Sequence, residues 1–399
     1  MGERVFDGLK VIDCASFIAG PAAATVMSDF GAEVFKIEPA GAGDPYRRRA
    51  TPPIGPGLKS NPGFELDGRN KKSLALDLRR PAGQAALRRL VGGADVFITN
   101  YPPPVRRRLG ITHEELAPLN ERLIYASFSG YGGRGDEAEK PGFDATAWWA
   151  RSGMMHLVRA GEAPPVRSLP GMGDHPSAMA VYGAIVTALY RRERTGEGSY
   201  VGSSLLANGL WANGCSVQAQ LCGERIQPQP VREALRFPLR NHYRCRDGRW
   251  LLFSIVADEH RWANFKTAVG RDALDAPQFA TAALREANAR ELTALLDEIF
   301  ASRDAAEWRR RLDAVGLVFG SVAEMDDIAH DEQIRANGML VPVAGQDLLT
   351  VDSPFWVAGE DKVPPRRAPT SGEHTDEVLA TAGLSAEEIQ ELRAAGVVA

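Results

Sequence analysis

Asp174 is the residue whose type and position most plainly suggest chemistry. It lies in the stretch "LPGMGDHPSAMAVYGAIVTALYRRERTGEG", between a glycine-containing turn and a long apolar run. A carboxylate at the start of a helix faces the positive end of the helix dipole and backbone N–H donors, which favour its ionised form. An ionised carboxylate can attack an activated acyl group, and Gly171 and Gly173 would leave room for the substrate. Spacing alone favours a helix N-cap, a role that is compatible with the nucleophile.

The other reactive residue types form no comparable pattern. The seven histidines are isolated from one another and the four cysteines form no C-x-x-C pair, so we expect no metal site. His175 follows Asp174 directly, and we expect it to have a local structural role. The first turn, "CASFIAGPAAA", lacks the G-x-G-x-x-G fingerprint, which argues against a nicotinamide-dependent dehydrogenase.

The elements that must position Asp174 begin with an α/β pattern. The segment "GLKVIDCASFIAGPAAATVMSDFGAEVFKIE" predicts strand, helix and strand. Further strands are predicted at "KSLALDL", "ADVFITN" and "RLIYASFSGYG", with a helix over 81–92. Strands that alternate with helices at this spacing indicate a parallel sheet in an α/β fold.

The pattern changes after residue 175. Helical spacing of apolar residues predicts a helix over 176–194, and a second long helix is predicted over 203–221. A hairpin with Asp247-Gly248 at its turn follows, then a mainly helical region, a strand near "LLTVDSPFWVAG" and two short C-terminal helices, the second capped by Ser385. We expect a large domain over 1–222, a small domain over 223–330, and a C-terminal part over 331–399 that returns to the large domain.

Bulk properties restrict the class of partner. The chain has 399 residues and a net charge of −4, which argues against a general nucleic-acid binder. It contains no signal-like N-terminus and no apolar run long enough to span a membrane. Scattered cysteines suit a reducing compartment, so we expect a cytoplasmic protein.

Six collinear segments resemble the family III CoA-transferases, whose members include the formyl-CoA:oxalate, carnitine and bile-acid enzymes and, as a divergent relative, α-methylacyl-CoA racemase. They are "GLKVIDCASFIAGPAAATVMSDFGAEVFKIEPAGAGDPYR", "GRNKKSLALDLRRPAGQAALRRLVGGADVFITNYPPPVRRRLGI", "RLIYASFSGYG", "PGFDATAWWARSGMM", "GDHPSAMAVYGAIVTALYRRERTGEGSYV" and "GEHTDEVL". The resemblance implies a Rossmann-like large domain built from both chain ends, a smaller inserted α+β domain, and an interlocked homodimer.

The resemblance also implies the chemistry. Asp174 matches the family's nucleophile, which forms a mixed anhydride and then an aspartyl-CoA thioester as CoA moves from an acyl-CoA to a carboxylic acid. Coenzyme A is then substrate and product, and no tightly bound cofactor is expected. Backbone N–H groups near Gly171 and Gly173 could stabilise the tetrahedral oxyanions.

Residues for CoA binding follow from the same resemblance. They are Phe17, Ile18, Lys72, Leu74, Arg108 and, as a further candidate on the phosphate or pantetheine path, Lys140. Lys72 and Arg108 would suit the ADP phosphates, although either could equally be a surface cation.

Two departures from the family pattern narrow the reaction. Phe143 stands in "PGFD" where racemase members carry a histidine, and a phenyl ring cannot move a proton. Ile18 stands where oxalate-using members carry a glutamine, and no tetraglycine run occurs between Gln220 and His242, so oxalate is not favoured as substrate. Trp148, Trp149 and Met155 could line a larger apolar pocket or simply belong to the core.

Three alternatives stay open, and the missing glycine fingerprint already counts against one of them, a dehydrogenase. An acyl-CoA racemase or isomerase would need a second acid or base, for which Asp258 and Glu259 are conceivable. A non-catalytic paralogue would bind CoA and form no covalent intermediate.

Overall fold

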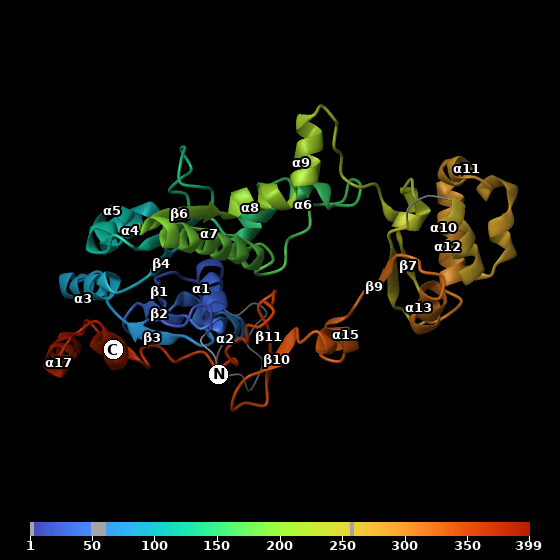
Figure 1. Cartoon of the computed structure of the whole chain (residues 1–399). Coiled ribbons are helices and arrows are strands. Elements are labelled where there is room, and N and C mark those ends of the chain that lie inside the picture. The colour runs from blue at the N-terminus through green and yellow to red at the C-terminus, as the bar shows by residue number, and fades with distance from the viewer. Residues whose placement is uncertain (1–3, 49–60, 256–258) are drawn as a thin grey trace. The chain divides into compact units, whose positions relative to one another are not determined.

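The computed structural model describes residues 4–48, 61–255 and 259–399. The chain forms two compact units (Figure 1). The large unit takes residues 1–155, 167–224 and 333–399, and the small unit takes residues 156–166 and 225–332. The large unit therefore uses both ends of the chain, and a short segment, 156–166, leaves it early to join the small unit.

A six-stranded parallel sheet forms the centre of the large unit, which confirms the predicted α/β class. Its spatial order is β3-β2-β1-β4-β5-β6. The strands are β1 (Lys10–Asp13), β2 (Glu33–Glu38), β3 (Lys72–Ala75), β4 (Val96–Thr99), β5 (Ile124–Ser129) and β6 (Ser199–Ser204). The strand order reverses between β1 and β4, so the loops that follow these two strands diverge and leave a crevice at their carboxyl ends.

Each face of the sheet carries its own hydrophobic core. Val11 of β1 belongs to the core under α1 (Ala19–Asp29) and α7 (Asp174–Thr195), whereas Ile12 belongs to the opposite core. The opposite core contains α3 (Pro81–Gly92) and the C-terminal helices α16 (Thr375–Thr381) and α17 (Ala386–Ala394). The alternation follows from the two-residue period of a strand. Every residue of α1 is buried, and its alanines let α7 pack closely on it.

The large unit also contains several shorter elements. They are α2 (Pro62–Gly68), α4 (Pro103–Leu109), α5 (His113–Leu116), a π-helical segment (Asp144–Ala150), α6 (Met154–Leu157), α8 (Leu205–Ala212), α9 (Gly214–Leu221), α15 (Glu332–Ala336) and the antiparallel pair β10 (Leu340–Pro342) and β11 (Leu349–Val351). The boundary between the two units falls within α6 and again within α15.

The predicted long helix over 203–221 is wrong. Residues 199–204 form the sixth strand, and the helix is broken at Asn213, which lies between α8 and α9.

The small unit combines helices with a three-stranded antiparallel sheet, β7-β8-β9. The predicted hairpin is present, and Gly248 at its turn has φ +84°, a conformation that glycine adopts without strain. The strands are β7 (His242–Arg244), β8 (Trp250–Phe253) and β9 (Phe319–Ser321), and the helices are α10 (Glu259–Val269), α11 (Ala282–Ala287), α12 (Ala289–Phe300), α13 (Ala305–Asp313) and α14 (Met325–Ile328). Among the described residues, no helix is both long and apolar enough to cross a bilayer.

Candidate active site

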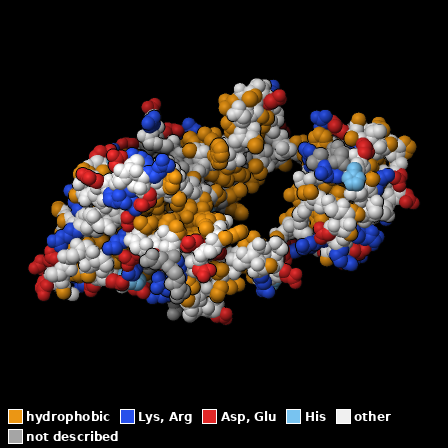
Figure 2. All heavy atoms as spheres, viewed as in Figure 1, with side chains coloured by type: hydrophobic (Ala, Val, Ile, Leu, Met, Phe, Trp, Pro, Cys, Tyr) orange, Lys and Arg blue, Asp and Glu red, His pale blue; other side chains and the backbone are white. Residues whose placement is uncertain are grey.

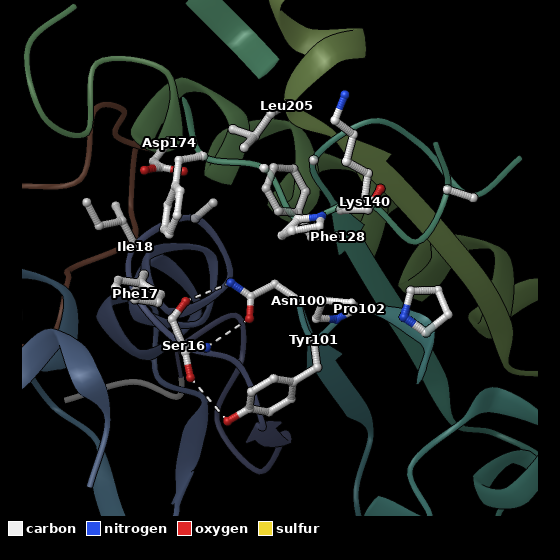
Figure 3. Close-up of a pocket in the computed structure, with 18 of the residues that line it drawn as sticks. Ser16, Phe17, Ile18, Asn100, Tyr101, Pro102, Phe128, Lys140, Asp174 and Leu205 are labelled. Carbon is white, nitrogen blue, oxygen red and sulfur yellow. Dashed lines mark hydrogen bonds between the residues drawn. The ribbon is translucent and has the colours of Figure 1, made fainter. Parts of the chain in front are cut away.

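Side-chain hydrogen bonds join the loop after β1 to the loop after β4 at the crevice. Asn100 accepts a hydrogen bond from the backbone N–H of Ser16 at 2.9 Å and donates one to the Ser16 carbonyl at 2.7 Å. The hydroxyls of Ser16 and Tyr101 lie 3.1 Å apart (Figure 3). These contacts fix the β1 loop against the β4 loop and shape the floor of the crevice.

Phe17, next in the β1 loop, adopts a left-handed backbone conformation with φ 64°, which is unusual for a residue other than glycine. Asp44 supports it by accepting hydrogen bonds from the N–H groups of Phe17 (3.4 Å) and Tyr46 (2.9 Å). Lys36 lies 2.9 Å from Asp44 and is fully buried with it. Burial alone would lower the pKa of Lys36, but the charges of Asp13 and Asp44 outweigh it and hold the ammonium protonated.

A cavity of about 270 Å³ occupies the crevice. We call this cavity the switch-point cavity, because it lies where the strand order of the sheet reverses. Its walls come from both loops, from the end of β5 and from the segment around 140–143, and Asp174 and Leu205 close one side (Figure 3). Five residues predicted for the site meet here: Phe17, Ile18, Lys140, Phe143 and Asp174. The rings of Phe17 and Phe143 meet edge to face with centroids 5.5 Å apart, so the wall beside Asp174 is apolar.

Asp174 is the first residue of α7, and Gly173 is the N-cap. No side-chain capping hydrogen bond is formed there, so the expectation of a bare N-cap is wrong and the carboxylate is left to face the cavity. Burial, and then the charges of Asp144 and Asp67, raise the pKa of Asp174 to about 7, while the charge of His175 acts in the opposite direction. Near neutral pH the group therefore changes between a carboxylic acid and a nucleophilic carboxylate.

Asp144 is a further candidate residue of the site, and the sequence analysis did not single it out. It begins the π-helical segment, is buried, and accepts hydrogen bonds from the backbone N–H groups of Gly173 (3.3 Å) and Ala145 (2.7 Å). It thus holds the turn that carries Asp174 and places a like charge beside it. The sequence signal for Asp144 is the motif "PGFD", in which this carboxylate directly follows Phe143.

Gly173 and Trp148 pack closely together beside Asp174. A Cβ atom at Gly173 would lie 2.6 Å from Cγ of Trp148, so only glycine fits against the indole ring. Gly171 has φ 74°, a backbone conformation that favours glycine, and a Cβ there would lie 3.2 Å from Nδ1 of His175. Trp148 and Trp149 are both buried in the core that contains α1 and α7. The substrate-pocket role suggested for Trp148 stays a prediction.

His175 and Asp67 form a pair on the other side of the same turn. Nε2 of His175 lies 3.1 Å from Oδ1 of Asp67. Burial alone would lower the pKa of His175, but the hydrogen bond and charge of Asp67, together with the charge of Asp174, raise it above its ordinary value. The predicted structural role of His175 is consistent with this pair, but Asp67 was not singled out.

Three predicted CoA-binding residues lie elsewhere. Arg108 lines a neighbouring cavity of about 290 Å³, which shares Tyr101 with the switch-point cavity. Lys72 forms ion pairs with Glu33 (2.5 Å) and Glu377 (2.7 Å). The side chain of Leu74 is fully buried in the core that contains α3.

Two residues were named as conceivable acid or base partners for racemisation. Glu259 belongs to the small unit and forms an ion pair with Arg285 at 2.9 Å, and Asp258 lies outside the described residues. Within the ranges that the structure describes, no cluster of three or more His, Cys, Asp or Glu could hold a metal ion.

Comparison with known proteins gives consistent matches. The sequence profile described as CoA-transferase family III matches residues 6–375. The (R)-2-hydroxy-4-methylpentanoate CoA-transferase of Clostridioides difficile is 29% identical, with 99% of each chain covered. The cinnamoyl-CoA:phenyllactate CoA-transferase of Clostridium sporogenes is 30% identical, covering 98% of this chain and 96% of that one. A solved CAIB/BAIF family protein from Brucella suis superposes with a TM-score of 0.84 at 27% identity, covering 96% of this chain and 100% of that chain.

Proposed function

Because this chain belongs to CoA-transferase family III, we propose that it moves CoA from an acyl-CoA thioester to a carboxylic acid through covalent intermediates on Asp174. The observation that carries the proposal is the position of Asp174. Its carboxylate lies at the positive end of α7, faces a cavity with an apolar wall, and is not used as a helix cap.

The proposed reaction has four steps. The Asp174 carboxylate attacks the thioester carbonyl, the C–S bond breaks, and CoA leaves as a thiolate from a mixed anhydride. The thiolate then attacks the aspartyl carbonyl, which releases the donor acid and forms an aspartyl-CoA thioester. The acceptor carboxylate attacks this thioester to give a second anhydride and the thiolate. The thiolate finally attacks the acceptor's carbonyl, which forms the new thioester and regenerates Asp174.

The surroundings of Asp174 suit these intermediates. An anhydride is lost to hydrolysis unless water is kept away, and the edge-to-face pair of Phe17 and Phe143 supplies an apolar wall. Backbone N–H groups at the turn containing Gly171 and Gly173 are the proposed donors to the oxyanions. Phe143 has no proton to transfer, which favours transfer of CoA over racemisation.

We propose that CoA enters along the switch-point cavity. Phe17 and Ile18 lie beside the nucleophile, and Lys140 lines the same cavity while pairing with Glu137 at 2.6 Å. Arg108, in the adjoining cavity, is a second cation for the phosphates. Lys72 and Leu74 stay predictions that rest on the family resemblance.

We further propose an interlocked homodimer that works in the cytoplasm. Hydrophobic side chains gather on the surface over α8 and α9 (Figure 2), where Trp211 is 87% exposed and Leu221 is 76% exposed. Apolar surface of this kind is typical of a face that a partner covers. The four cysteines are unpaired, as a reducing compartment would keep them.

Intact-mass spectrometry tests the covalent intermediate. The wild type, Asp174→Asn and the control Asp376→Asn, which changes an exposed carboxylate of α16, are incubated with a panel of acyl-CoAs. A CoA-sized adduct that hydroxylamine removes should form on the wild type and the control, and be absent from Asp174→Asn. An adduct of equal yield on Asp174→Asn would disprove the role of Asp174. Deuterium uptake at the acyl α-carbon without any adduct would favour the isomerase alternative.

A further inference from the structure

Phe17 has a backbone conformation that its surroundings must hold in place. Its φ is 64°, and a bulky residue other than glycine rarely occupies this left-handed region because the conformation is strained. Strain of this kind persists only where neighbouring groups fix it, and it is frequent beside reactive groups. Phe17 lines the switch-point cavity together with Asp174 (Figure 3). The groups that hold Phe17 can therefore affect the reaction at Asp174.

Asp44 joins the loop after β1 to the loop after β2. Its Oδ1 accepts hydrogen bonds from the backbone N–H groups of Phe17 at 3.4 Å and of Tyr46 at 2.9 Å. Pro45, which follows Asp44 directly, lines the switch-point cavity as well. Asn100 holds the β1 loop from the side of β4. The β1 loop is thus fastened on both sides, and Asp44 fastens it on the side of β2.

Buried charges fix the carboxylate of Asp44 in turn. Asp44 is 1% exposed, and its Oδ2 lies 2.9 Å from Nζ of Lys36, which is 2% exposed. Lys36 also forms an ion pair with Asp13 at 3.7 Å and donates a hydrogen bond to the carbonyl of Ala15 in the β1 loop. The backbone N–H of Asp44 donates to Oε2 of Glu38 at 2.9 Å. Buried charges are tolerated when partners of this kind satisfy them, and the same contacts leave Asp44 little freedom to move away from Phe17.

The position of the Phe17 ring matters because the proposed intermediates can also react with water. Water adds to a carbonyl carbon of the anhydride, and the C–O bond to the other acyl group breaks. The products are the donor acid and the carboxyl group of Asp174, and CoA leaves as the free thiol after it takes up a proton. The net reaction is hydrolysis of the acyl-CoA. The ring of Phe17 meets that of Phe143 edge to face in the wall beside Asp174, so a displaced ring would expose the acyl group to water.

We propose that Asp44, fixed by Lys36, is a positioning residue for CoA transfer: it keeps the ring of Phe17 beside Asp174, so that the acyl intermediates pass to CoA and the acceptor acid and not to water. The inference deepens the proposed CoA transfer and rests on it. Asp44 acts through Phe17. Its substitution should therefore change the fate of the acyl group more than the rate at which Asp174 is acylated.

The ratio of hydrolysis to transfer tests this role. Acetyl-CoA, propionyl-CoA and succinyl-CoA are each incubated with the protein and with the isotopically labelled form of their own acid. Label that enters the acyl-CoA measures transfer, and free CoA thiol measures hydrolysis. Asp44→Asn keeps an oxygen that can accept a hydrogen bond but removes the charge that pairs with Lys36. It should raise the ratio by roughly tenfold, the size expected when a hydrogen bond to a charged group is lost.

Asp29→Asn is the matched control. Asp29 is as buried as Asp44 and forms an ion pair with Arg69 at 2.6 Å, but it lies at the opposite end of α1 from the switch-point cavity, which Ala19 lines. This variant should lower the melting temperature and keep the ratio of the wild type.

A glycine variant tests whether Asp44 acts through the ring. Phe17→Gly removes the ring, and glycine adopts a φ of 64° without strain. It should raise the ratio by itself. Adding Asp44→Asn to it should change the ratio little, because no ring remains to be positioned.

The outcomes separate the inference from the function beneath it. An unchanged ratio in Asp44→Asn, an equal rise in Asp29→Asn, or an effect of Asp44→Asn that persists in Phe17→Gly overturns the role of Asp44, while an adduct on Asp174 still supports CoA transfer. If Asp44→Asn fails to fold, Phe17→Gly alone keeps the test valid, since an unchanged ratio there overturns the inference. Absence of both transfer and adduct with every donor would overturn the proposed function and this inference together.

Discussion

At the scale of single residues, the central feature of the site is the raised pKa of the Asp174 carboxyl group. The proposed attack requires the negative charge of Asp174, whereas burial and the charge of Asp144 oppose that charge and raise the pKa of Asp174 to about 7. Raising the pKa of a carboxylate also makes it more basic, and hence a stronger nucleophile once it is ionised. The like charge of Asp144 is therefore a means of tuning reactivity as well as a support for the turn.

The pH dependence of the reaction follows from this arrangement. The kcat/KM of the wild type should rise with pH through a midpoint near 7, because only the ionised form of Asp174 attacks. Asp144→Asn keeps an oxygen that can accept from Gly173 but removes the neighbouring charge, so the midpoint should fall towards the ordinary range of an aspartate. Steady-state kinetics between pH 5 and 9 measure both midpoints. An unchanged midpoint in Asp144→Asn would contradict the electrostatic role.

Stability should change with pH in the opposite sense to activity. The pKa of Asp174 is about 7 in the folded protein and near 3.8 when unfolded, so folding favours the protonated form. Its contribution is present at low pH and is lost as pH rises through 7. Asp174→Asn, which removes the buried charge, should therefore raise the free energy of unfolding at pH 8 by on the order of 2 kcal/mol and change it less at pH 5. Urea unfolding at both pH values measures the difference, and equal effects at the two values would exclude it.

At the scale of elements, helix α7 carries Asp174 as its first residue, and the packing of this helix holds Asp174 in place. It packs along α1, and its first turn rests on Trp148 through Gly173. The same helix contains a second glycine, Gly183, whose surroundings are open. A methyl group added at Gly173 would contact the indole ring of Trp148, whereas one added at Gly183 would enter open space.

A pair of glycine variants tests this support. Gly173→Ala places its Cβ against the indole ring and should lower both the melting temperature and kcat/KM, since the turn that holds Asp174 must shift. Gly183→Ala should stabilise the protein by about 0.5–1 kcal/mol and leave the kinetics unchanged, because alanine favours a helix interior. Thermal unfolding and steady-state kinetics follow both variants. Full activity in Gly173→Ala would show that the contact does not position Asp174.

The sequence predicted the elements whose patterns are strong. Strands β1 to β5 are short apolar runs between turn residues, and α3 begins at Pro81 as expected. Strand β6 was missed because "SYVGSS" is polar and its residues are alternately exposed, as suits the edge of a sheet. The apolar residues after it favoured one long helix, and the Asn213-Gly214 pair, which is a common turn signal, was not used to place the break.

The site was predictable only in part, for a related reason. Asp174 lies in a motif that resemblance identifies, and Phe17, Ile18 and Phe143 follow from neighbouring motifs. Asp67 and Asp144 are distant from Asp174 in the sequence and approach it only through packing of α2 and the π-helical segment. Contacts between residues so far apart in the sequence cannot be read from the periodicity of apolar residues.

At the scale of the whole molecule, the chain builds its large unit from three separate stretches. The last stretch supplies Val378, Leu379, Val397 and Val398 to a core of the sheet. That core therefore depends on residues that lie far apart in the sequence.

The oligomeric state is the prediction at this scale. Multi-angle light scattering should give twice the chain mass of 43.2 kDa for the wild type. Trp211→Glu places a charge in the exposed apolar surface over α8 and should shift the population towards the monomer. A wild type that elutes at the mass of one chain would contradict the proposed homodimer.

The close packing of α1 against α7 has a consequence for how this protein can diverge. Asp174 lies on a helix that packs on α1 and on β5 and β6 of the sheet, whereas the walls of the switch-point cavity come largely from loops, including the segment around 140–143. Mutations in those loops can reshape this cavity while the position of Asp174 is kept. Substrate preference can therefore change in small steps during evolution while the proposed reaction at Asp174 is kept.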